Sequence, residues 1–237
     1  MKTLTFENLT LEIRESARRS TLELIVERDG SLILATPPGV PQATLEAFVE
    51  ERSEWLYTKL IEKEQQARLH EPRQYVTGEG FYYQGRSYRL KIVDAAPQDT
   101  AAQKPPLRLY QGRFTLRGNA LPQAQEHFIQ WYTVHLPPIL DEHLAALTER
   151  IEATPREVHI QDMGYRWASV NRRGHLYFHW RVAMLPYRMS EYLVAHELVH
   201  LRERYHTPAF WERLERVLPN YEERRQWLAE QGGLYDL

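Results

Sequence analysis

The residues of this chain best suited to chemistry lie in the segment His196-Glu197-Leu198-Val199-His200. On an α-helix, residues four apart differ by about 40° around the axis and about 6 Å along it, so both imidazoles can reach one metal ion. Glu197 would then lie beside that ion. Two neutral histidine ligands and a carboxylate that takes a proton from an activated water are what a zinc hydrolase requires. The segment therefore predicts two metal ligands and a general base.

The surroundings of this motif predict a buried helix. Composition alone would produce His-Glu-x-x-His by chance in roughly a few chains per hundred, so the motif needs supporting context. Neither glycine nor proline interrupts residues 187–207, and the neighbours of the motif are apolar or aromatic: Tyr192, Leu193, Val194, Leu198, Val199 and Leu201. Apolar residues on both sides favour a buried functional helix over an exposed charged helix with two incidental histidines.

A catalytic zinc usually has three protein ligands and one open position, so a third ligand is needed. His206 lies six residues beyond His200, and on a continuous helix it would face away. The helix is expected to end first, because the residue before a proline avoids helical geometry and Thr207-Pro208 suits the start of a new helix. His206 would then lie in the corner between two helices. Glu203, seven residues after His196, is the alternative ligand, although it is also typical of a solvated surface charge.

Composition narrows the classes of protein. The chain has 237 residues, 43% of them hydrophobic, which allows one large domain or two small ones with ordinary cores. Its formal net charge of -2 gives no strong signal for nucleic-acid binding, although a local basic patch stays open. Cysteine is absent, which excludes disulfides, thiolate nucleophiles and cysteine-bound zinc. Histidines and carboxylates must therefore carry any metal chemistry.

The sequence gives no sign of a membrane. No run of apolar residues approaches the length of a membrane span, and the first residues lack the apolar core of a signal peptide. We therefore expect no membrane partner and a cytoplasmic location.

The first part of the chain is predicted to combine a β-hairpin with a long helix. Residues 21–26 alternate as a strand does, and Asp29-Gly30 favours a tight turn into a second strand at 31–35. Apolar residues recur at helical spacing from Pro41 to about residue 69. The basic segment 14–20 is either a site for phosphate or a partner, or a solvated edge that discourages aggregation.

A second β-rich stretch follows. We expect two hairpins in it, with turns at Gln84-Gly85 and Gln111-Gly112 and an exposed loop at 94–105 between them. Its aromatic residues favour a strand core over base stacking: Phe81, Tyr82, Tyr83 and Tyr88. We divide the chain into an N-terminal part rich in β-hairpins, residues 1–118, and a metal-dependent hydrolase core, residues 119–237.

The C-terminal part mixes helices with short strands, so the expected fold class is α+β. Residues 121–151 have a helical pattern that is interrupted at Pro137-Pro138. Three histidines in it are about 12 Å apart in steps of eight residues, too far to bind one metal: His127, His135 and His143. The pattern predicts three short strands, at 157–162, 165–170 and 175–181.

Several C-terminal motifs occur together: Arg166-Trp167-Ala168-Ser169-Val170, the turn Asn171-Arg172-Arg173-Gly174, His179-Trp180-Arg181, HELVHLRERYHTPAFW from His196 to Trp211, Pro219-Asn220-Tyr221 and Trp227. In these the chain resembles the YgjP-like metallopeptidase-domain family, which is related to SprT-like and other minimal zincins. Residues 16–40 and 82–90 extend the likeness over nearly the whole chain. The resemblance implies a zincin-type core in which a small sheet packs on the metal helix. It also implies three ligands, His196, His200 and His206, with Glu197 as general base.

Two residues depart from the pattern of the family. Val170 stands where members commonly have cysteine, so a thiol at this position is not essential to any activity retained here. His179 stands where members commonly have asparagine. On a strand that faces the metal it would contact substrate or stabilise an oxyanion; facing the core it would be a hydrogen-bonded histidine. With Arg166, Arg173 and Arg181 it forms the set of candidate substrate-binding residues.

The expected reaction is hydrolysis by a water that the metal activates. Zinc is the default ion for three histidines, and nickel, cobalt or manganese would suit the same ligands. A peptide substrate would lie along the strand that carries Leu176, Phe178 and Trp180, if that strand is a sheet edge.

Two alternatives stay open. The resemblance also implies pyrophosphatase activity on nucleoside triphosphates such as UTP, and the arginines near the motif suit phosphate oxygens. No glycine-rich phosphate loop accompanies them, which weakens this interpretation. The second alternative is an accessory protein without catalysis, for which the resemblance to SprT-like relatives implies a DNA-linked partner. The presence of Glu197 argues against it.

Overall fold

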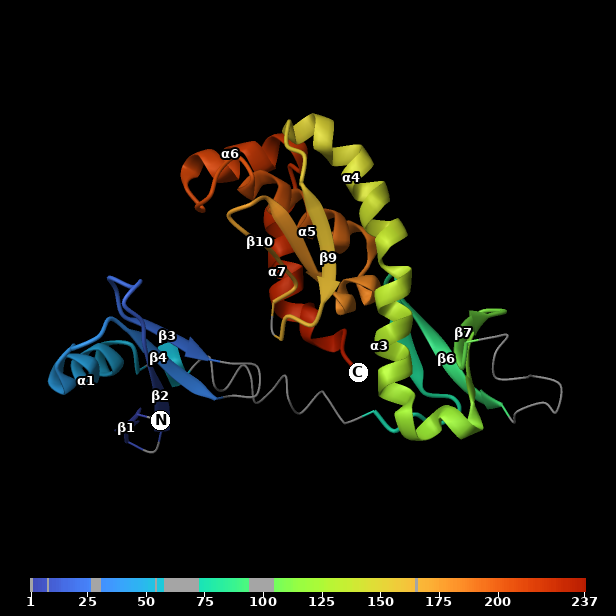
Figure 1. Cartoon of the computed structure of the whole chain (residues 1–237), viewed down its shortest axis with the longest axis horizontal. Coiled ribbons are helices and arrows are strands. Elements are labelled where there is room, and N and C mark those ends of the chain that lie inside the picture. The colour runs from blue at the N-terminus through green and yellow to red at the C-terminus, as the bar shows by residue number, and fades with distance from the viewer. Residues whose placement is uncertain are drawn as a thin grey trace. The chain divides into compact units, whose positions relative to one another are not determined.

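The computed structural model describes residues 2–7, 9–26, 31–53, 55–57, 73–93, 105–164 and 166–237. The contacts divide the chain into two compact units, Met1–Glu71 and Pro72–Leu237. Both units combine helices with small sheets, so the predicted α+β class is confirmed (Figure 1). Within these ranges, none of the helices combines the length and the apolarity that a bilayer crossing requires.

Unit 1 consists of a four-stranded sheet and a helix. Its elements are β1 (Lys2–Phe6), β2 (Leu9–Glu15), β3 (Glu23–Val26), β4 (Leu32–Thr36) and α1 (Gln42–Glu51). The strands lie in the order β1-β2-β4-β3, and β2 and β4 are parallel. Strand β4 is buried throughout, and its Leu32 and Leu34 share a core with Leu45 and Val49 of α1.

The predictions for unit 1 are confirmed only in part. Strands β3 and β4 form the expected antiparallel hairpin, although its turn at Asp29-Gly30 lies outside the described residues. The prediction of one continuous helix is wrong, because α1 ends with its C-cap at Arg52. Residues 55–57 are helical again, and positions 58–69 lie outside the described residues.

The basic segment 14–20 runs from the end of β2 into the loop before β3. Arg14 forms an ion pair with Glu12, and Arg19 forms one with Glu23 of β3. Strand β3 is an edge strand, so the pair between Arg19 and Glu23 agrees with the interpretation of the segment as a solvated edge.

Unit 2 begins with a second four-stranded sheet. Its strands are β5 (Gly80–Tyr83), β6 (Arg86–Val93), β7 (Leu107–Tyr110) and β8 (Arg113–Arg117). Their order, β5-β6-β8-β7 with β6 and β8 parallel, repeats the topology of the sheet in unit 1. Both expected turns are confirmed, because Gln84-Gly85 and Gln111-Gly112 have positive φ at both residues, as tight hairpin turns require. Of the expected loop between the hairpins, residues 94–104 lie outside the described residues.

The rest of unit 2 is mainly helical. Its helices are η1 (Gly118–Gln123), α3 (Ala124–His135), α4 (Pro137–Ile151), η2 (Trp180–Met184), α5 (Tyr187–His200), α6 (Pro208–Val217), α7 (Tyr221–Gln231) and η3 (Gly232–Leu234). Its strands are β9 (Glu157–Gln161), β10 (Ala168–Val170) and β11 (His175–His179). The expected interruption at Pro137-Pro138 is confirmed, since α3 ends at His135 and α4 begins at Pro137.

The β5–β8 sheet shares its core with these helices. Phe81 is fully buried and stacks on Phe128 of α3, with ring centroids 4.1 Å apart. Phe114 of β8 packs edge-on against Phe128 and Trp131. The expected core role of the aromatic strand residues is thus confirmed for Phe81. The boundary between the compact units lies after Glu71, and the boundary expected from sequence lies after residue 118. Residues 73–118 belong with the C-terminal part because their aromatic face is buried against α3.

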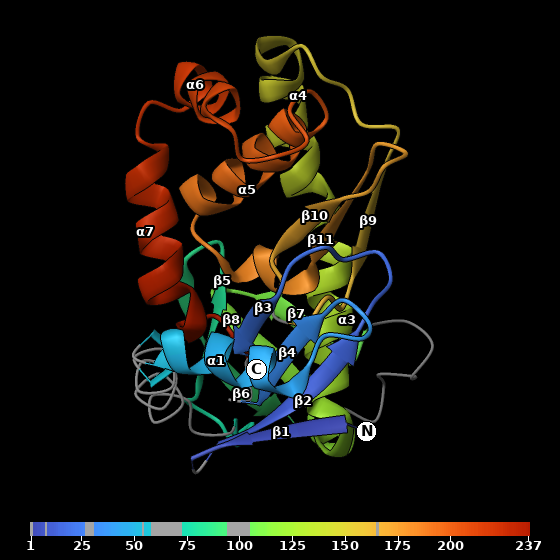
Figure 2. The same cartoon turned by 90° about the vertical axis from the view of Figure 1, so that its left-hand side faces the viewer.

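Helix α5 is at the centre of unit 2. Helices α4, α6 and α7 and strand β10 contact it (Figure 2). The three-stranded sheet has the order β10-β11-β9, with β11 parallel to β9 and antiparallel to β10. Leu176 and Phe178 of β11 are buried in one core with Leu193 and Val194 of α5. A small sheet packed on the motif helix is therefore confirmed, but β11 is the central strand and cannot offer a free edge to a peptide.

The β5–β6 turn holds the chain just before α5. The backbone N–H of Gln84 donates to the carbonyl of Ala183, and that of Gly85 donates to the carbonyl of Met184, both at 2.9 Å. A Cβ on Gly85 would lie 2.9 Å from Cα of Pro186, the N-cap residue of α5. The turn thus fixes where α5 begins.

Candidate metal centre

Three histidine side chains converge near the C-terminal end of α5: His196 and His200 belong to the helix, and His206 follows it. The helix ends at His200, with Leu201 as its C-cap, and the chain turns back before Thr207, the N-cap of α6. The expected end of the helix before His206 is confirmed. The Nε2 atom of His200 lies 3.2 Å from that of His196 and 3.1 Å from that of His206, and the latter two atoms are 3.0 Å apart.

This donor set fits a divalent metal ion. Nitrogen ligands about 2.0–2.1 Å from a tetrahedral zinc ion lie roughly 3.3 Å from one another, close to the separations found here. The Nδ1 of His200 donates to the carbonyl of Glu203 at 3.1 Å, so the neutral ring keeps a lone pair on Nε2. Three neutral imidazoles that face one another cannot all be satisfied by hydrogen bonds among themselves. A cation that accepts all three lone pairs satisfies them together.

Glu203, the alternative third ligand, contacts the histidines through its backbone. Its backbone oxygen, rather than its carboxylate, contacts the histidine cluster. Among the described residues, the group of side chains able to hold an ion here consists of His196, His200 and His206. The geometry therefore favours His206 over Glu203.

The surroundings keep these histidines neutral. Burial lowers the pKa of His196 to about 3, and the two neighbouring histidines and Arg225 act in the same direction. Burial also lowers the pKa values of His200 and His206. Neutral imidazoles are the form that binds a metal, so the cluster is held in its ligating state at neutral pH.

Glu197 is buried beside the cluster and lines the same groove. Its side chain follows His196 on α5 and is 6% exposed. Burial raises the pKa of this carboxyl to about 8, and the positive charge of Arg166 opposes the shift. In its ionised form, a carboxylate with a raised pKa is a stronger base than an ordinary glutamate.

Two aromatic side chains of α6 support the histidines. Phe210 is fully buried, and its ring centroid lies 4.9, 4.5 and 4.8 Å from those of His196, His200 and His206. Trp211 stacks on His206 at 5.2 Å. Sequence reasoning missed both residues as parts of the site. The sequence feature that could have identified them is their position in the first turn of the helix that begins at Pro208. That turn faces the corner where His206 lies.

A groove of about 830 Å³ opens in front of the histidines. It is bounded by β10, the turn 171–174, the end of α5 and the segment that leads to His206. Among the described residues that line it, Glu197 is the one acid, and five are arginines: Arg166, Arg172, Arg173, Arg202 and Arg204. Arg202 donates to the carbonyl of Glu152. The groove therefore suits a substrate with negative charge near the metal centre.

Strand β10 is the sheet edge along this groove. The backbone N–H of Asn171 donates to the carbonyl of His175 at 3.0 Å. In an antiparallel pair the direction of the backbone groups alternates, so those of Ser169 also face β11 while those of Ala168 and Val170 point away from it. The edge open to a peptide is thus β10 rather than β11.

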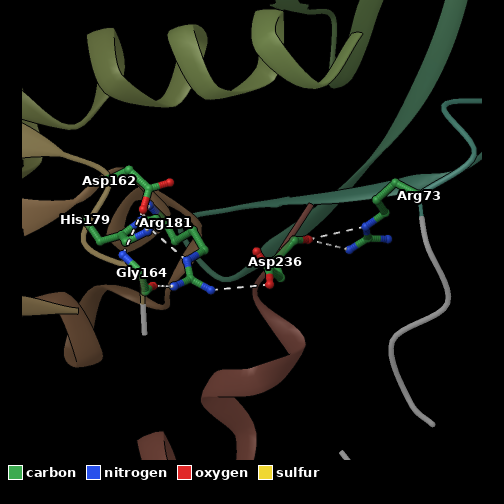
Figure 3. A network of polar contacts seen from close by, with 6 residues as sticks. All are labelled: Arg73, Asp162, Gly164, His179, Arg181 and Asp236. Atoms are coloured by element: carbon green, nitrogen blue, oxygen red, sulfur yellow. Dashed lines mark hydrogen bonds and ion pairs between the residues drawn. The ribbon is translucent and has the colours of Figure 1, made fainter. Parts of the chain in front are cut away.

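The candidate substrate-binding residues fall into two groups. Arg166 and Arg173 line the groove, whereas His179 and Arg181 are absent from its lining and are only 1% and 3% exposed. Figure 3 shows these two in a separate polar network. The Nδ1 of His179 accepts the backbone N–H of Arg181 at 3.1 Å, and its Nε2 lies 3.4 Å from Oδ1 of Asp162. Of the two interpretations of His179, the structure matches the hydrogen-bonded core histidine.

Arg181 ties this network to the C-terminus. Its guanidinium donates to the carbonyl of Gly164 and lies 3.3 Å from the carboxylate of Asp236. Arg73 donates to the backbone carbonyl of Asp236 from the other side (Figure 3). The arginine therefore has a structural environment of its own, away from the groove.

Comparisons with known proteins point to one family. No curated protein matches the chain. A solved structure described as the metallopeptidase zymogen of Pyrococcus abyssi abylysin has 22% sequence identity and a TM-score of 0.36, and the match covers 39% of this chain and 95% of that one. A family model described as YgjP-like, metallopeptidase domain matches residues 20–231. The chain therefore belongs to the YgjP-like metallopeptidase-domain family, which indicates a metal-dependent, peptidase-like hydrolase with a divalent ion.

Proposed function

We propose that the chain is a zinc-dependent peptide hydrolase in which His196, His200 and His206 hold one ion and Glu197 is the general base. The observation that carries this proposal is the triangle of three Nε2 atoms, 3.0 to 3.2 Å apart, with Glu197 on the same groove. When bound, zinc supplies polarisation of the scissile carbonyl and a lower pKa for water. Nickel, cobalt or manganese would suit the same nitrogen ligands.

Glu197 moves the proton in this mechanism. Its carboxylate accepts a proton from the attacking water and later delivers it to the leaving nitrogen, so the group returns to its starting state. Burial supports this role, because a raised pKa brings the carboxyl close to the operating pH. The positive charge of Arg166 acts in the opposite direction, because it stabilises the ionised carboxylate.

Strand β10 is suited to hold an extended peptide. The backbone groups of Ala168 and Val170 point away from β11 and can pair with a substrate strand, a mode of recognition that gives affinity without demanding one side-chain sequence. The exposed Arg172 and Arg173 at the end of the strand favour peptides with acidic residues or a free carboxylate nearby.

A nucleoside triphosphate is the second candidate substrate. The five arginines of the groove favour it, since guanidinium groups pair well with phosphate oxygens. The same three histidines and Glu197 would then serve hydrolysis of a phosphoanhydride. Peptide and nucleotide thus compete for one site.

One experiment separates the two. The full-length protein is loaded with zinc and incubated with unfolded casein and, separately, with UTP, and cleaved peptide and released pyrophosphate are measured. Peptide release alone supports the peptidase, and pyrophosphate release alone supports the second candidate. Absence of both, in protein that elemental analysis has shown to carry zinc, would contradict hydrolysis of either class.

A further inference from the structure

A second cluster of metal-ligating side chains lies on β9 and β11, and none of its members lines the groove. It consists of Glu157, His159 and His175, whose ligand atoms all lie within 4.8 Å of one another. We propose that these three side chains bind a second divalent transition-metal ion, with zinc as the ion that suits them best. The site shares no residue with the proposed catalytic centre, so the proposal does not depend on the function of that centre.

The positions of the ligand atoms match a small coordination sphere. The carboxylate Oε2 of Glu157 lies 3.0 Å from Nε2 of His159 and 3.1 Å from Nδ1 of His175. Oxygen and nitrogen ligands about 2.0–2.2 Å from a zinc ion are separated by roughly 3.3 Å in tetrahedral geometry. Both carboxylate contacts are thus close to the value needed, and the two histidine nitrogens lie within 4.8 Å of each other.

The register of the sheet brings the three side chains together. In the parallel pairing of β9 with β11, His175 lies opposite Glu157 and Tyr177 lies opposite His159. Residues two apart on a strand share a face, so all three ligands project on one side of the sheet. The alternate residues, such as Leu176 and Ile160, pack on the core side. Strands hold ligands in place better than loops do, and the site is therefore built before an ion arrives.

Neighbouring rings orient both imidazoles. Tyr177 stacks on His159, with centroids 5.0 Å apart and planes inclined by 22°, and His175 stacks on the same imidazole at 5.7 Å. The amide of Asn171 donates to the hydroxyl of Tyr177 at 3.1 Å. Such partners around the ligands restrict ring rotation, which raises the affinity for an ion.

The donor types select the class of ion. Two imidazoles and one carboxylate are a common zinc set, with water completing the coordination, whereas calcium and magnesium prefer oxygen ligands. The side chains of Glu157 and His159 are 58% and 41% exposed, so a hydrated ion can enter directly from solvent. Bound there, the ion would cross-link β9 to β11 and stabilise the sheet whose other edge borders the groove.

Zinc stoichiometry tests this proposal. The full-length protein is stripped with a chelator and dialysed against a buffer of controlled free zinc, and bound metal is determined by elemental analysis. We expect two equivalents in the wild type and one in His159→Ala, Glu157→Ala and the double variant His196→Ala with His200→Ala. Combining the double variant with His159→Ala should leave none. The control His127→Ala, which removes a partly buried histidine of α3, should keep two.

The outcome is decisive in either direction. Loss of one equivalent in both His159→Ala and Glu157→Ala, with circular dichroism unchanged, supports the second site. An absence of bound zinc in the double variant His196→Ala with His200→Ala, or a zinc content that is unchanged in both His159→Ala and Glu157→Ala, would overturn it. The double variant keeps all three ligands of the second site, so its zinc content tests the proposal even where His159→Ala or Glu157→Ala fails to fold.

Discussion

The indole of Trp211 stacks on the imidazole of His206, with ring centroids 5.2 Å apart and planes inclined by 17°. Tyr221 stacks on the same indole at 5.3 Å. His206 is the most exposed of the three clustered histidines and lies in a segment without regular structure between α5 and α6. The stacked indole is therefore a main support for the position of its ring.

Replacing Trp211 with leucine should weaken zinc binding at the proposed site by roughly 10–100-fold, the usual effect of losing a group that orients a ligand. Without the stacked indole, the ring of His206 must be ordered when the ion binds, and this ordering costs binding free energy. Competition with a chromophoric chelator measures the affinity. Trp55→Leu, at a tryptophan of unit 1 that is 44% exposed, is the control and should bind zinc as the wild type does. Equal affinity in Trp211→Leu would show that the stacking does not hold the ligand.

Two glycines in equivalent hairpin turns provide a matched pair. Gly85 and Gly112 have φ of 76° and 72°, so alanine is strained at both by about 1 kcal/mol. At Gly85 the added Cβ would also lie 2.9 Å from Pro186, whereas at Gly112 it would meet no atom within 4 Å. Overpacking of this kind costs about 1–3 kcal/mol. In urea unfolding, Gly85→Ala should thus lose clearly more free energy of unfolding than Gly112→Ala, and equal losses would contradict the docking of the turn on α5.

Mutation of Arg181 should lower stability, whereas mutation of Arg173 should weaken substrate binding. Arg181→Lys removes a guanidinium that is 3% exposed and paired with Asp236 and Gly164, so the free energy of unfolding should fall by about 1–3 kcal/mol. Arg173→Ala removes an exposed side chain of the groove and should raise KM with little effect on stability. Steady-state kinetics and thermal unfolding of both variants make the comparison. A reversed pattern would place Arg181 in the substrate site.

Stability should depend on pH through His143. This fully buried side chain lies 2.9 Å from Oγ of Ser190, and burial lowers its pKa while Glu191 and Glu142 act in the opposite direction. A base with a lowered pKa contributes stability above about pH 6.5, its ordinary value, and that contribution is lost as the pH falls toward the folded-state value.

His143→Gln removes this titration and keeps a polar group near Ser190. Relative to the variant, the wild type should therefore be more stable at about pH 7.5 than at about pH 5. Urea unfolding of both proteins at the two pH values measures the difference. A difference that is the same at both values would mean that His143 does not titrate in this range.

The local parts of the structure could be predicted from sequence. The spacing of His196 and His200 and the proline after Thr207 act within a few residues, because helix geometry and helix ends are local properties. The turns at Gln84-Gly85 and Gln111-Gly112 were predictable for the same reason.

Features that depend on distant partners were not predictable. Whether β10 or β11 is the sheet edge depends on pairing with β9, and no local pattern records that order. The burial of His179 and Arg181 depends on Asp162 and Asp236, which lie on other segments. The boundary between the units also depends on a nonlocal contact, the packing of Phe81 against α3.

The most direct test of the proposed mechanism is the activity of Glu197→Gln at equal zinc occupancy. Glutamine has nearly the same shape but cannot accept the proton, so turnover of the substrate identified for the wild type should be abolished while the zinc bound at the three histidines stays. Glu212→Gln, at an exposed residue of α6, is the matched control and should keep full activity. Undiminished activity in Glu197→Gln, at the zinc content of the wild type, would contradict the role of Glu197 as general base.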